Sequence, residues 1–269
     1  MKIIVITGAS DGIGAEMARQ LARRHGAGVG LVLAARNEDR LQTVAARCTE
    51  LGAQALVVPT DVSQEPACRQ LIATAIAKFG RIDALINNAG MSAQALLEDV
   101  RAEDLAWYEQ LMRINLWGSV WCTHAALPWL KQSRGSIVAV SSLAGLVGVP
   151  GRTAYSATKF AMTGFFEALR AEMKTAGVSV TTAYPGVVST NIRHHGFNAA
   201  GLPAGSSGLR EDRAMSVEEC ARLIINGMDK REREVVMTAK GKFGRWLKLV
   251  APGRVEAMAL AALKDDVKP

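Results

Sequence analysis

The feature that most constrains this chain is a glycine-rich turn placed directly after its first apolar segment. Residues 3–7 read Ile-Ile-Val-Ile-Thr, and Gly8, Gly12 and Gly14 follow before a helical pattern begins. In a strand–turn–helix unit, such glycines allow a tight turn, a close approach of the backbone to a pyrophosphate, and close packing of helix on strand. Free N–H groups at the start of the helix would face the phosphates. The pattern predicts a parallel α/β fold with a dinucleotide site.

Apolar segments alternate with helical patterns through the first 184 residues. We expect strands at residues 3–7, 29–34, 55–59, 84–87, 136–141 and 179–184, with helices at 13–25, 37–51, 64–79, 104–131 and 154–176. Continuous apolar strands separated by helices are typical of a parallel sheet covered on both faces. No linker rich in Pro, Ser or charge divides them. The predicted fold class is α/β: one doubly wound, Rossmann-type parallel sheet flanked by helices over residues 1–239, with a C-terminal helical tail.

Two segments depart from this alternation. Residues 191–215 are rich in Gly, Ala, Asn and Ser and follow the sixth strand, so we interpret them as a lid-like insertion, with an ordinary surface loop as the alternative. In the tail, residues 240–269, the stretch 240–252 predicts a basic amphipathic helix with Phe243 and Trp246 on its apolar face. Such a helix suits peripheral contact with a membrane surface, packing on its own domain, or packing on a second subunit.

Charge and cysteine content exclude several functions. The net charge is +7, but the basic residues are spread along the chain without a nucleic-acid-binding motif, so we expect no nucleic-acid partner. The four cysteines, at positions 48, 68, 122 and 220, lack close pairing and metal-ligand spacing, which predicts reduced thiols, no metal site and a cytoplasmic protein. The N-terminal apolar run is too short for a signal-peptide core, and no apolar stretch is long enough to span a bilayer.

Three further motifs accompany the glycine turn. The run Asn-Asn-Ala-Gly occupies residues 87–90, a Ser-Ser pair occupies 141–142, and Tyr155-x-x-x-Lys159 lies in the following helical segment. With the Gly8-x-x-x-Gly12-x-Gly14 spacing, they make the chain resemble the classical group of short-chain dehydrogenases/reductases over about residues 2–240. The resemblance implies an enzyme that interconverts a carbonyl and an alcohol by hydride transfer with a nicotinamide cofactor.

Four polar residues form the candidate catalytic set. On a helix, Tyr155 and Lys159 share one face, and a nearby cation brings the phenol's pKa down from about 10 toward the operating range. Tyr155 would then act as general acid and base at the reacting oxygen. By the resemblance, Ser142, 13 residues before Tyr155, binds the substrate oxygen. The resemblance also implies that Lys159 binds the cofactor ribose and that Asn115 holds a water linking Lys159 to solvent.

The end of the second strand indicates NADP(H). NAD-specific folds place an acid there for the ribose 2′-hydroxyl, whereas residues 34–37 read Ala-Ala-Arg-Asn. The guanidinium of Arg36 suits a 2′-phosphate, with a solvated loop charge as the alternative. Asp11 runs against this choice, because many NADP-preferring relatives have a basic residue in the glycine loop. The resemblance assigns the cofactor site to Gly8, Ser10, Asp11, Gly12, Ile13, Gly14, Arg36, Asp61, Val62, Asn88, Ala89, Gly90, Tyr155, Lys159, Pro185, Gly186, Val188 and Thr190.

Substrate and assembly are less constrained. Residues 144–150, with Phe197 and Leu202, indicate an apolar pocket for small-to-medium lipophilic carbonyls or alcohols, with sugars as an alternative. The resemblance implies a homodimer or homotetramer formed through the helices at 104–131 and 154–176. The alternative function is a catalytically idle NADP-binding regulator or a membrane-surface scaffold. The complete four-residue catalytic set argues against an idle protein.

Overall fold

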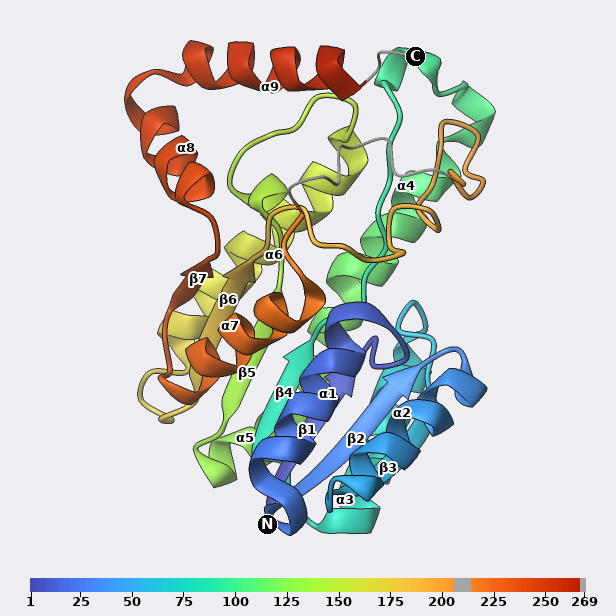
Figure 1. Ribbon diagram of the computed structural model, residues 1–269, viewed down its shortest axis with the longest axis vertical. Helices are drawn as coiled ribbons and strands as arrows, with labels where there is room; N and C mark the ends of the chain where they lie inside the picture. The colour runs from blue at the N-terminus through green and yellow to red at the C-terminus, as the bar shows by residue number, and fades with distance from the viewer. Residues whose placement is uncertain (206–213, 267–269) are drawn as a thin grey trace.

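The computed structural model describes residues 1–205 and 214–266, and its central element is a parallel sheet. The seven strands are β1 (Lys2–Thr7), β2 (Val29–Ala35), β3 (Gln54–Pro59), β4 (Ala84–Asn87), β5 (Ser136–Val140), β6 (Ser179–Tyr184) and β7 (Glu234–Val236). Their order is β3-β2-β1-β4-β5-β6-β7, so the direction of winding reverses between β1 and β4 (Figure 1). Ligands of such sheets bind outside the carboxyl ends of the strands at this reversal. The predicted doubly wound fold is confirmed; β7 was not predicted.

Helices cover both faces of the sheet. The helices that pack on the faces are α1 (Gly12–His25), α2 (Glu38–Glu50), α3 (Glu65–Phe79), α5 (Gly118–Ser133), α6 (Thr153–Glu172) and α7 (Val217–Asp229). The helices α4 (Ala106–Met112), α8 (Ala239–Val250) and α9 (Pro252–Asp266) lie above the sheet in the view of Figure 1. Several begin at side chains that accept a backbone hydrogen bond, as Asn37 does for α2 and Ser216 for α7. Such caps satisfy N–H groups that the first helical turn leaves without partners.

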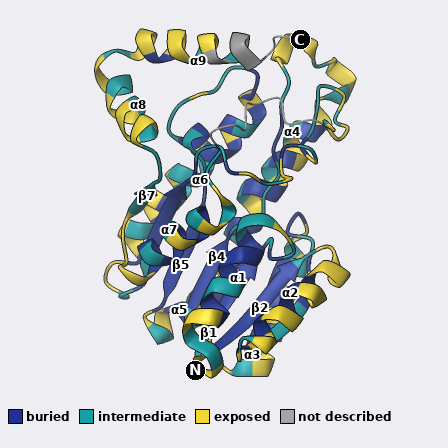
Figure 2. Cartoon of the chain, in the orientation of Figure 1, coloured by how far each residue is buried: buried dark blue, intermediate teal, exposed yellow. Residues whose placement is uncertain are grey.

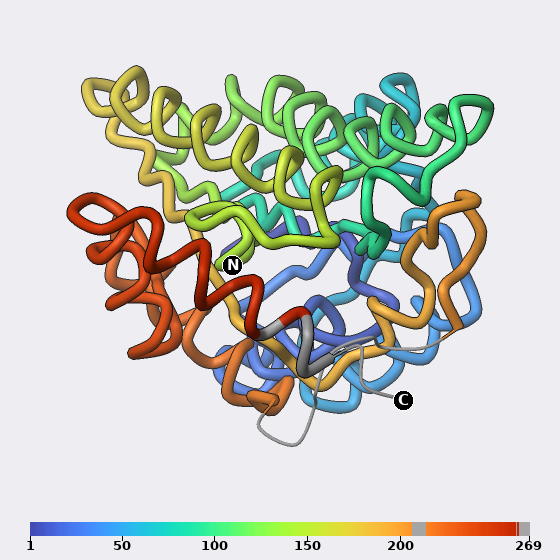
Figure 3. The backbone as a smooth tube through the Cα atoms, turned by 90° about the horizontal axis from the view of Figure 1, so that it is seen from above, coloured from blue at the N-terminus to red at the C-terminus, as the bar shows by residue number. Residues whose placement is uncertain are grey.

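The core has two layers because successive strand residues point to opposite faces of the sheet. In β1, Ile4 and Ile6 pack with residues of α1, α2 and α7, whereas Ile3 and Val5 pack with residues of α3, α5 and α6. Figure 3 shows the helices of these two groups on either side of the sheet, and Figure 2 shows the inner strands β1, β2, β4, β5 and β6 mostly buried. Burial on both faces explains why the strands read as uninterrupted apolar runs.

The prediction of one continuous helix at residues 104–131 was wrong. The segment begins with a 3₁₀ turn at Ala102–Asp104, continues as α4, and widens into a π-helical turn at Arg113–Trp117 before α5. The wide turn contains Asn115, whose carboxamide bonds the backbone of Met91 rather than facing solvent. Insertions of this kind occur often at functional sites.

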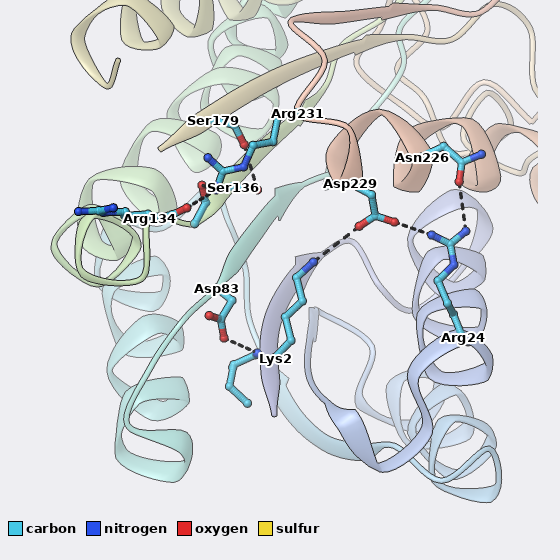
Figure 4. Close-up of polar contacts among 11 residues, drawn as sticks. Lys2, Arg24, Asp83, Arg134, Ser136, Ser179, Asn226, Asp229 and Arg231 are labelled. Atoms are coloured by element: carbon cyan, nitrogen blue, oxygen red, sulfur yellow. Dashed lines mark hydrogen bonds and ion pairs between the residues drawn. The ribbon is translucent and has the colours of Figure 1, made fainter. Parts of the chain in front are cut away.

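Polar contacts join α1 to α7 at the amino ends of the strands, opposite the ligand-binding edge (Figure 4). Asp229 lies 2.5 Å from Arg24 and 3.6 Å from Lys2, and Arg24 also bonds Asn226 at 3.2 Å. Because these groups are partly exposed, each pair contributes at most about 1 kcal/mol. The contacts therefore fix the relative position of the two helices more than they stabilise the fold.

Residues 191–205 of the predicted lid are tied to the loop that follows β4. Phe197 donates its backbone N–H to the Ser92 carbonyl at 3.0 Å, and Gln94 donates to the Phe197 carbonyl at 2.8 Å. The ring of Phe197 packs at 5.7 Å from that of Trp107. Of the remainder of the predicted lid, residues 206–213 lie outside the described residues, and Met215 donates its backbone N–H to the Val187 carbonyl at 2.9 Å.

Candidate active site

Tyr155 and Ser142 meet at the carboxyl end of β5. Tyr155 lies in the first turn of α6, and Ser142 begins the short turn after β5, where its hydroxyl accepts a hydrogen bond from the Ala144 N–H at 3.2 Å. Burial is the strongest influence on the Tyr155 phenol and raises its pKa above the ordinary value, whereas the neighbouring Ser142 lowers the pKa in part. Positive charge on Arg152 and Arg193 lowers the same pKa further. A phenol beside a serine hydroxyl can exchange a proton with a substrate oxygen that both groups reach.

Lys159 lies one helical turn beyond Tyr155 and is buried, with 4% of its surface exposed. Its ammonium donates to the Val140 carbonyl at 3.0 Å and lies 5.7 Å from the centre of the Tyr155 ring. Burial lowers the pKa of Lys159 to about 8. Burying an ammonium with one carbonyl partner lowers the free energy of unfolding, and such destabilising charges are typical of groups retained for function.

This buried charge predicts that Lys159→Met stabilises the protein without cofactor at pH 7. The folded-state pKa of about 8 lies below the ordinary 10.5, so the unfolded chain binds the proton more tightly. The resulting penalty is about 3 kcal/mol well below pH 8 and disappears as the pH rises through 10.5. Loss of the bond to Val140 offsets about 1 kcal/mol of the gain. Urea unfolding should therefore show a gain of about 1–2 kcal/mol at pH 7 that shrinks at pH 10.

The exposed Lys78 on α3 offers a matched control, because Lys78→Met removes a charge that solvent already stabilises. Its unfolding free energy should change by less than about 0.5 kcal/mol. A Lys159→Met protein that is less stable than the parent at pH 7 would contradict this account of the buried ammonium.

Asn115 joins the loop after β4 to α6. Its amide nitrogen donates to the Met91 carbonyl at 3.0 Å and to the Thr158 hydroxyl at 2.9 Å, while its oxygen accepts from the Met91 N–H at 2.8 Å. A Cβ added at Gly90 would lie 3.2 Å from the Asn115 oxygen and 3.7 Å from the Lys159 ammonium. Asn115, Gly90 and Lys159 thus lie together; the water relay expected of Asn115 stays a prediction.

The glycine turn lies beside this group, at the start of α1. Gly8 has a φ of +66°, and a Cβ there would lie 2.8 Å from the Ala89 Cα. A Cβ on Gly14 would lie 2.2 Å from the Gly8 carbonyl oxygen, so only glycine permits α1 to start against the turn. The backbone is thereby kept open at the helix N-terminus, where phosphates bind favourably. These residues fit a dinucleotide.

The end of β1 and the residues that follow β4 hold the glycine turn in place. The Thr7 hydroxyl accepts from the backbone N–H groups of Asn88 and Ala89, both at 3.0 Å. The Asn88 side chain donates to the carbonyls of Thr7 and Gly8 at 3.0 and 3.1 Å. Asn88 therefore shapes the turn directly, and its place beside the cofactor ribose stays a prediction.

The remaining predicted cofactor residues lie along the same edge of the sheet. Asp61 accepts from the Ser63 N–H at 2.9 Å after β3, and Val62 is buried there. After β6, Pro185 accepts from the Leu143 N–H at 3.0 Å. Ser10, Ile13 and Gly186 are half-buried in the flanking turns, and Val188 is buried. A cavity of about 260 Å³ is lined by Gly12 and Thr190, among others, between the glycine turn and the segment after β6.

Arg36 lies exposed at the end of β2, in the turn that leads to α2. Asp11 accepts from the Gly12 N–H at 2.7 Å, and its other oxygen lies 3.5 Å from the Arg40 guanidinium. Arg40 was missed by the sequence reasoning, although its position just after the cap of α2 was visible. The positive charge of Arg40 compensates the negative charge of Asp11, the residue that argued against an NADP site.

Sequence reasoning also missed two buried arginines beside Tyr155. Arg152 and Arg193 are 8% and 6% exposed, and both lower the pKa of the phenol. Arg152 was visible as a single charge in the apolar stretch before Tyr155, but its burial depends on contacts distant in the sequence. Within residues 1–205 and 214–266, no cluster of three His, Cys, Asp or Glu side chains could hold a metal ion.

Comparison with known proteins agrees with this geometry. A family model described as "short chain dehydrogenase" matches residues 2–200. The chain belongs to the short-chain dehydrogenase family. Members of this family are oxidoreductases that act on CH–OH and C=O groups with a nicotinamide cofactor.

Similar relatives are known from plants and an archaeon. The chain is 38% identical to "11-beta-hydroxysteroid dehydrogenase A" of Sesamum indicum over 95% of its own length and 73% of the relative's. It is 37% identical to "11-beta-hydroxysteroid dehydrogenase-like 4A" of Arabidopsis thaliana, with 93% and 81% covered. A solved alcohol dehydrogenase of Thermococcus sibiricus, complexed with 5-hydroxy-NADP, superposes with a TM-score of 0.72 at 26% identity, covering 88% of this chain and 94% of that one.

Proposed function

We propose that this short-chain dehydrogenase is an NADP(H)-dependent oxidoreductase that interconverts a carbonyl and a secondary or primary alcohol. The proposal rests chiefly on one observation, the buried ammonium of Lys159 5.7 Å from the centre of the Tyr155 ring, with Ser142 close enough to lower the pKa of that phenol. This group lies at the same edge of the sheet as the glycine turn, so one bound molecule can reach both. The exposed guanidinium of Arg36 and the Arg40–Asp11 pair support NADP(H) over NAD(H).

The proposed roles follow from the position of each group. When bound, the cofactor supplies or accepts the hydride at the substrate carbon. Ser142 donates a hydrogen bond to the carbonyl oxygen, and Tyr155 donates its proton as negative charge builds there. In the oxidative direction, Tyr155 accepts the alcohol proton instead. Lys159 binds the ribose and favours the phenolate. Asn115 holds the loop after β4 against α6, next to Lys159, and positions the water that links Lys159 to solvent.

The proposed substrate is a small-to-medium lipophilic carbonyl or alcohol. A small apolar cluster next to Tyr155 includes Ala93, Trp107, Leu111 and Phe197, from three separate segments. Such side chains favour an apolar substrate body and offer few partners for the many hydroxyls of a sugar. The names of the plant relatives suggest steroid ketones as one member of this class.

A carbonyl and alcohol panel tests the proposal directly. Consumption of NADPH, or reduction of NADP⁺, is followed by the absorbance of the nicotinamide with steroid, aliphatic, aromatic and sugar substrates. We expect turnover with lipophilic members and little with sugars. Tight binding of NADPH with no turnover on any member would instead favour the alternative, an idle NADP-binding regulator or scaffold.

We propose a homodimer or homotetramer, and Trp117 offers a test. Trp117 is 45% exposed at the start of α5 and stacks at 6.0 Å on Trp121, and Phe160 of α6 is 37% exposed. Exposed aromatic side chains on helices are typical of contact surfaces. Light scattering should find an oligomer at micromolar concentration that Trp117→Glu dissociates. The control Leu97→Glu, at another exposed apolar position, should leave it intact, and a monomeric parent would contradict the proposal.

In the part of the chain that the structure describes, no helix is both long and apolar enough to cross a membrane. The tail does present apolar side chains at its surface: Phe243, Trp246 and Leu249 of α8 are 53%, 59% and 80% exposed. Lys248, in contrast, turns back to donate to the Leu146 carbonyl at 3.1 Å and lies 4.6 Å from the centre of the Phe160 ring. The side of α8 that packs is therefore not its apolar face.

We propose that the protein is cytoplasmic and that residues 240–252 bind peripherally to membrane surfaces. An apolar helix face flanked by basic side chains can insert at the headgroup boundary. The parent should sediment with vesicles of acidic phospholipid, and the double variant Phe243→Ser and Trp246→Ser should stay in the supernatant. Leu97→Ser, which removes a comparably exposed apolar side chain elsewhere, serves as the control. Equal sedimentation of all three proteins, or none, would contradict the proposal.

A further inference from the structure

Arg152 occupies an unusual position immediately before α6. Its guanidinium is buried and donates to the Ser92 hydroxyl at 3.4 Å and to the Gln94 carboxamide oxygen at 3.1 Å. The backbone pairs in the same place, since Ala95 donates its N–H to the Gly151 carbonyl at 2.9 Å. Arg152 therefore joins the loop after β4, which contributes to the apolar cluster, to the helix that bears Tyr155.

The same guanidinium lies against Tyr155. Its Cζ atom is 6.0 Å from the centre of the phenol ring, close to the 5.7 Å that separates the Lys159 ammonium from that centre. The charged and polar groups described around this phenol come from four segments: Arg152 before α6, Lys159 in α6, Ser142 after β5 and Arg193 after β6. Arg193 also donates to the Val188 carbonyl at 2.9 Å, within its own segment after β6.

A buried cation acts more strongly on its neighbours than an exposed one, because little water screens it. The Arg152 and Lys159 cations, at similar distances from the Tyr155 ring, differ in how far they keep their charge as the pH rises. With a pKa of about 8, the Lys159 ammonium loses its proton within the range in which alcohol oxidation would be measured. A guanidinium stays charged throughout that range. A permanent charge therefore still favours the phenolate at a pH at which the Lys159 ammonium has lost its proton.

We propose that Arg152 is a positioning residue for the proposed acid–base reaction: it orients the first turn of α6 through Ser92 and Gln94 and supplies a permanent positive charge beside the Tyr155 phenol. The inference rests on the proposed role of Tyr155. Substitution of Arg152 should therefore change how the protonation of Tyr155 depends on pH, and not only how much active protein is present.

The first test compares pH profiles of alcohol oxidation, using a substrate found in the panel. Arg152→Gln keeps a polar side chain but removes the charge, so the rising limb of kcat/KM should move to higher pH. At pH 7, kcat/KM should fall by about 3–10-fold, because each pH unit changes the phenolate fraction tenfold. At a pH above the rising limb, where the phenol has lost its proton in both proteins, kcat/KM should return to that of the parent. Arg47→Gln, which removes an exposed charge on α2, should leave the profile unchanged.

Arg152→Lys extends the test if the Gln variant fails to fold. Lys keeps the charge near neutral pH but loses the planar fork, so its limb should stay close to that of the parent. If Arg152→Gln lowers kcat/KM equally at every pH and leaves the rising limb of the profile at the same pH, the role of Arg152 is purely structural and the proposal is overturned. A limb that moves fully in Arg152→Lys would overturn it as well.

A second measurement needs no turnover and so separates this inference from the proposed function. The chain has only three tyrosines, Tyr108, Tyr155 and Tyr184. Ultraviolet titration of the parent minus that of Tyr155→Phe isolates the Tyr155 phenol. The midpoint of this difference should rise when Arg152→Gln is present in both proteins. An unchanged midpoint would overturn the inference even if Tyr155 proves essential for activity.

Discussion

Replacing Tyr155 with Phe is expected to lower turnover by at least about 100-fold while leaving the affinity for NADP(H) within a few-fold. Phe keeps the ring that packs in the apolar cluster with Ala93, Trp107 and Phe197, so the fold of the site should persist. The change removes only the hydroxyl that lies near Ser142 and is proposed to donate the proton. Steady-state kinetics, with cofactor binding followed by the fluorescence of NADPH, measures both quantities.

Tyr108 provides a matched control for this substitution. Its ring belongs to the same apolar cluster, and its hydroxyl lies 2.9 Å from the Thr153 hydroxyl at the start of α6. Tyr108→Phe therefore removes a hydroxyl next to α6 without touching Ser142, and turnover should stay within a few-fold of the parent. Turnover retained by Tyr155→Phe with any substrate would remove Tyr155 as the acid.

The second large effect concerns the choice of cofactor. Arg36→Ala should weaken the binding of NADP(H) by about 10–150-fold, because a charge-assisted hydrogen bond to phosphate contributes about 1.5–3 kcal/mol. NAD(H), which lacks the 2′-phosphate, should bind nearly as before. Ala35→Asp should move the preference toward NAD(H), since an acid at the end of β2 binds the ribose 2′-hydroxyl and repels the phosphate.

Titration of both cofactors against each protein decides the matter. Arg47→Ala is the control, because Arg47 is also exposed on α2 but lies away from the end of β2 and pairs with Glu50. It should change neither affinity by more than about twofold. Equal losses of NADP(H) and NAD(H) affinity in Arg36→Ala, or tighter binding of NAD(H) by the parent, would show that the end of β2 was misinterpreted.

Much of the fold could be predicted because its signals are local. The strands buried on both faces appear as apolar runs, and Gly8 and Gly14 are required where a Cβ would collide with the neighbouring backbone or a side chain. The break between α4 and α5 could not be predicted, because Asn115 widens the helix through bonds to Met91, 24 residues away. β7 was missed because a three-residue strand at the sheet edge leaves almost no pattern.

In the site, too, features with a local sequence signal could be predicted, and features that depend on distant contacts could not. The spacing of Tyr155 and Lys159 on one helix was sufficient to bring them together. The burial of Arg152 depends on Ser92 and Gln94, about 60 residues earlier, and no local pattern reports such a pairing. The amphipathic pattern of α8 correctly predicted a helix, but not that its apolar face would stay exposed while Lys248 packs on the domain.

The central claim, hydride transfer between NADP(H) and a carbonyl substrate, is tested most directly by isotope transfer. The protein is incubated with a carbonyl from the panel and NADPH bearing deuterium at the reactive carbon of the nicotinamide, and the product alcohol is analysed by mass spectrometry. The account predicts an alcohol with deuterium on its carbinol carbon, formed by the parent and by Tyr108→Phe and nearly absent with Tyr155→Phe. An alcohol without deuterium, or labelled NADPH that stays bound and unconsumed with every carbonyl offered, would contradict it.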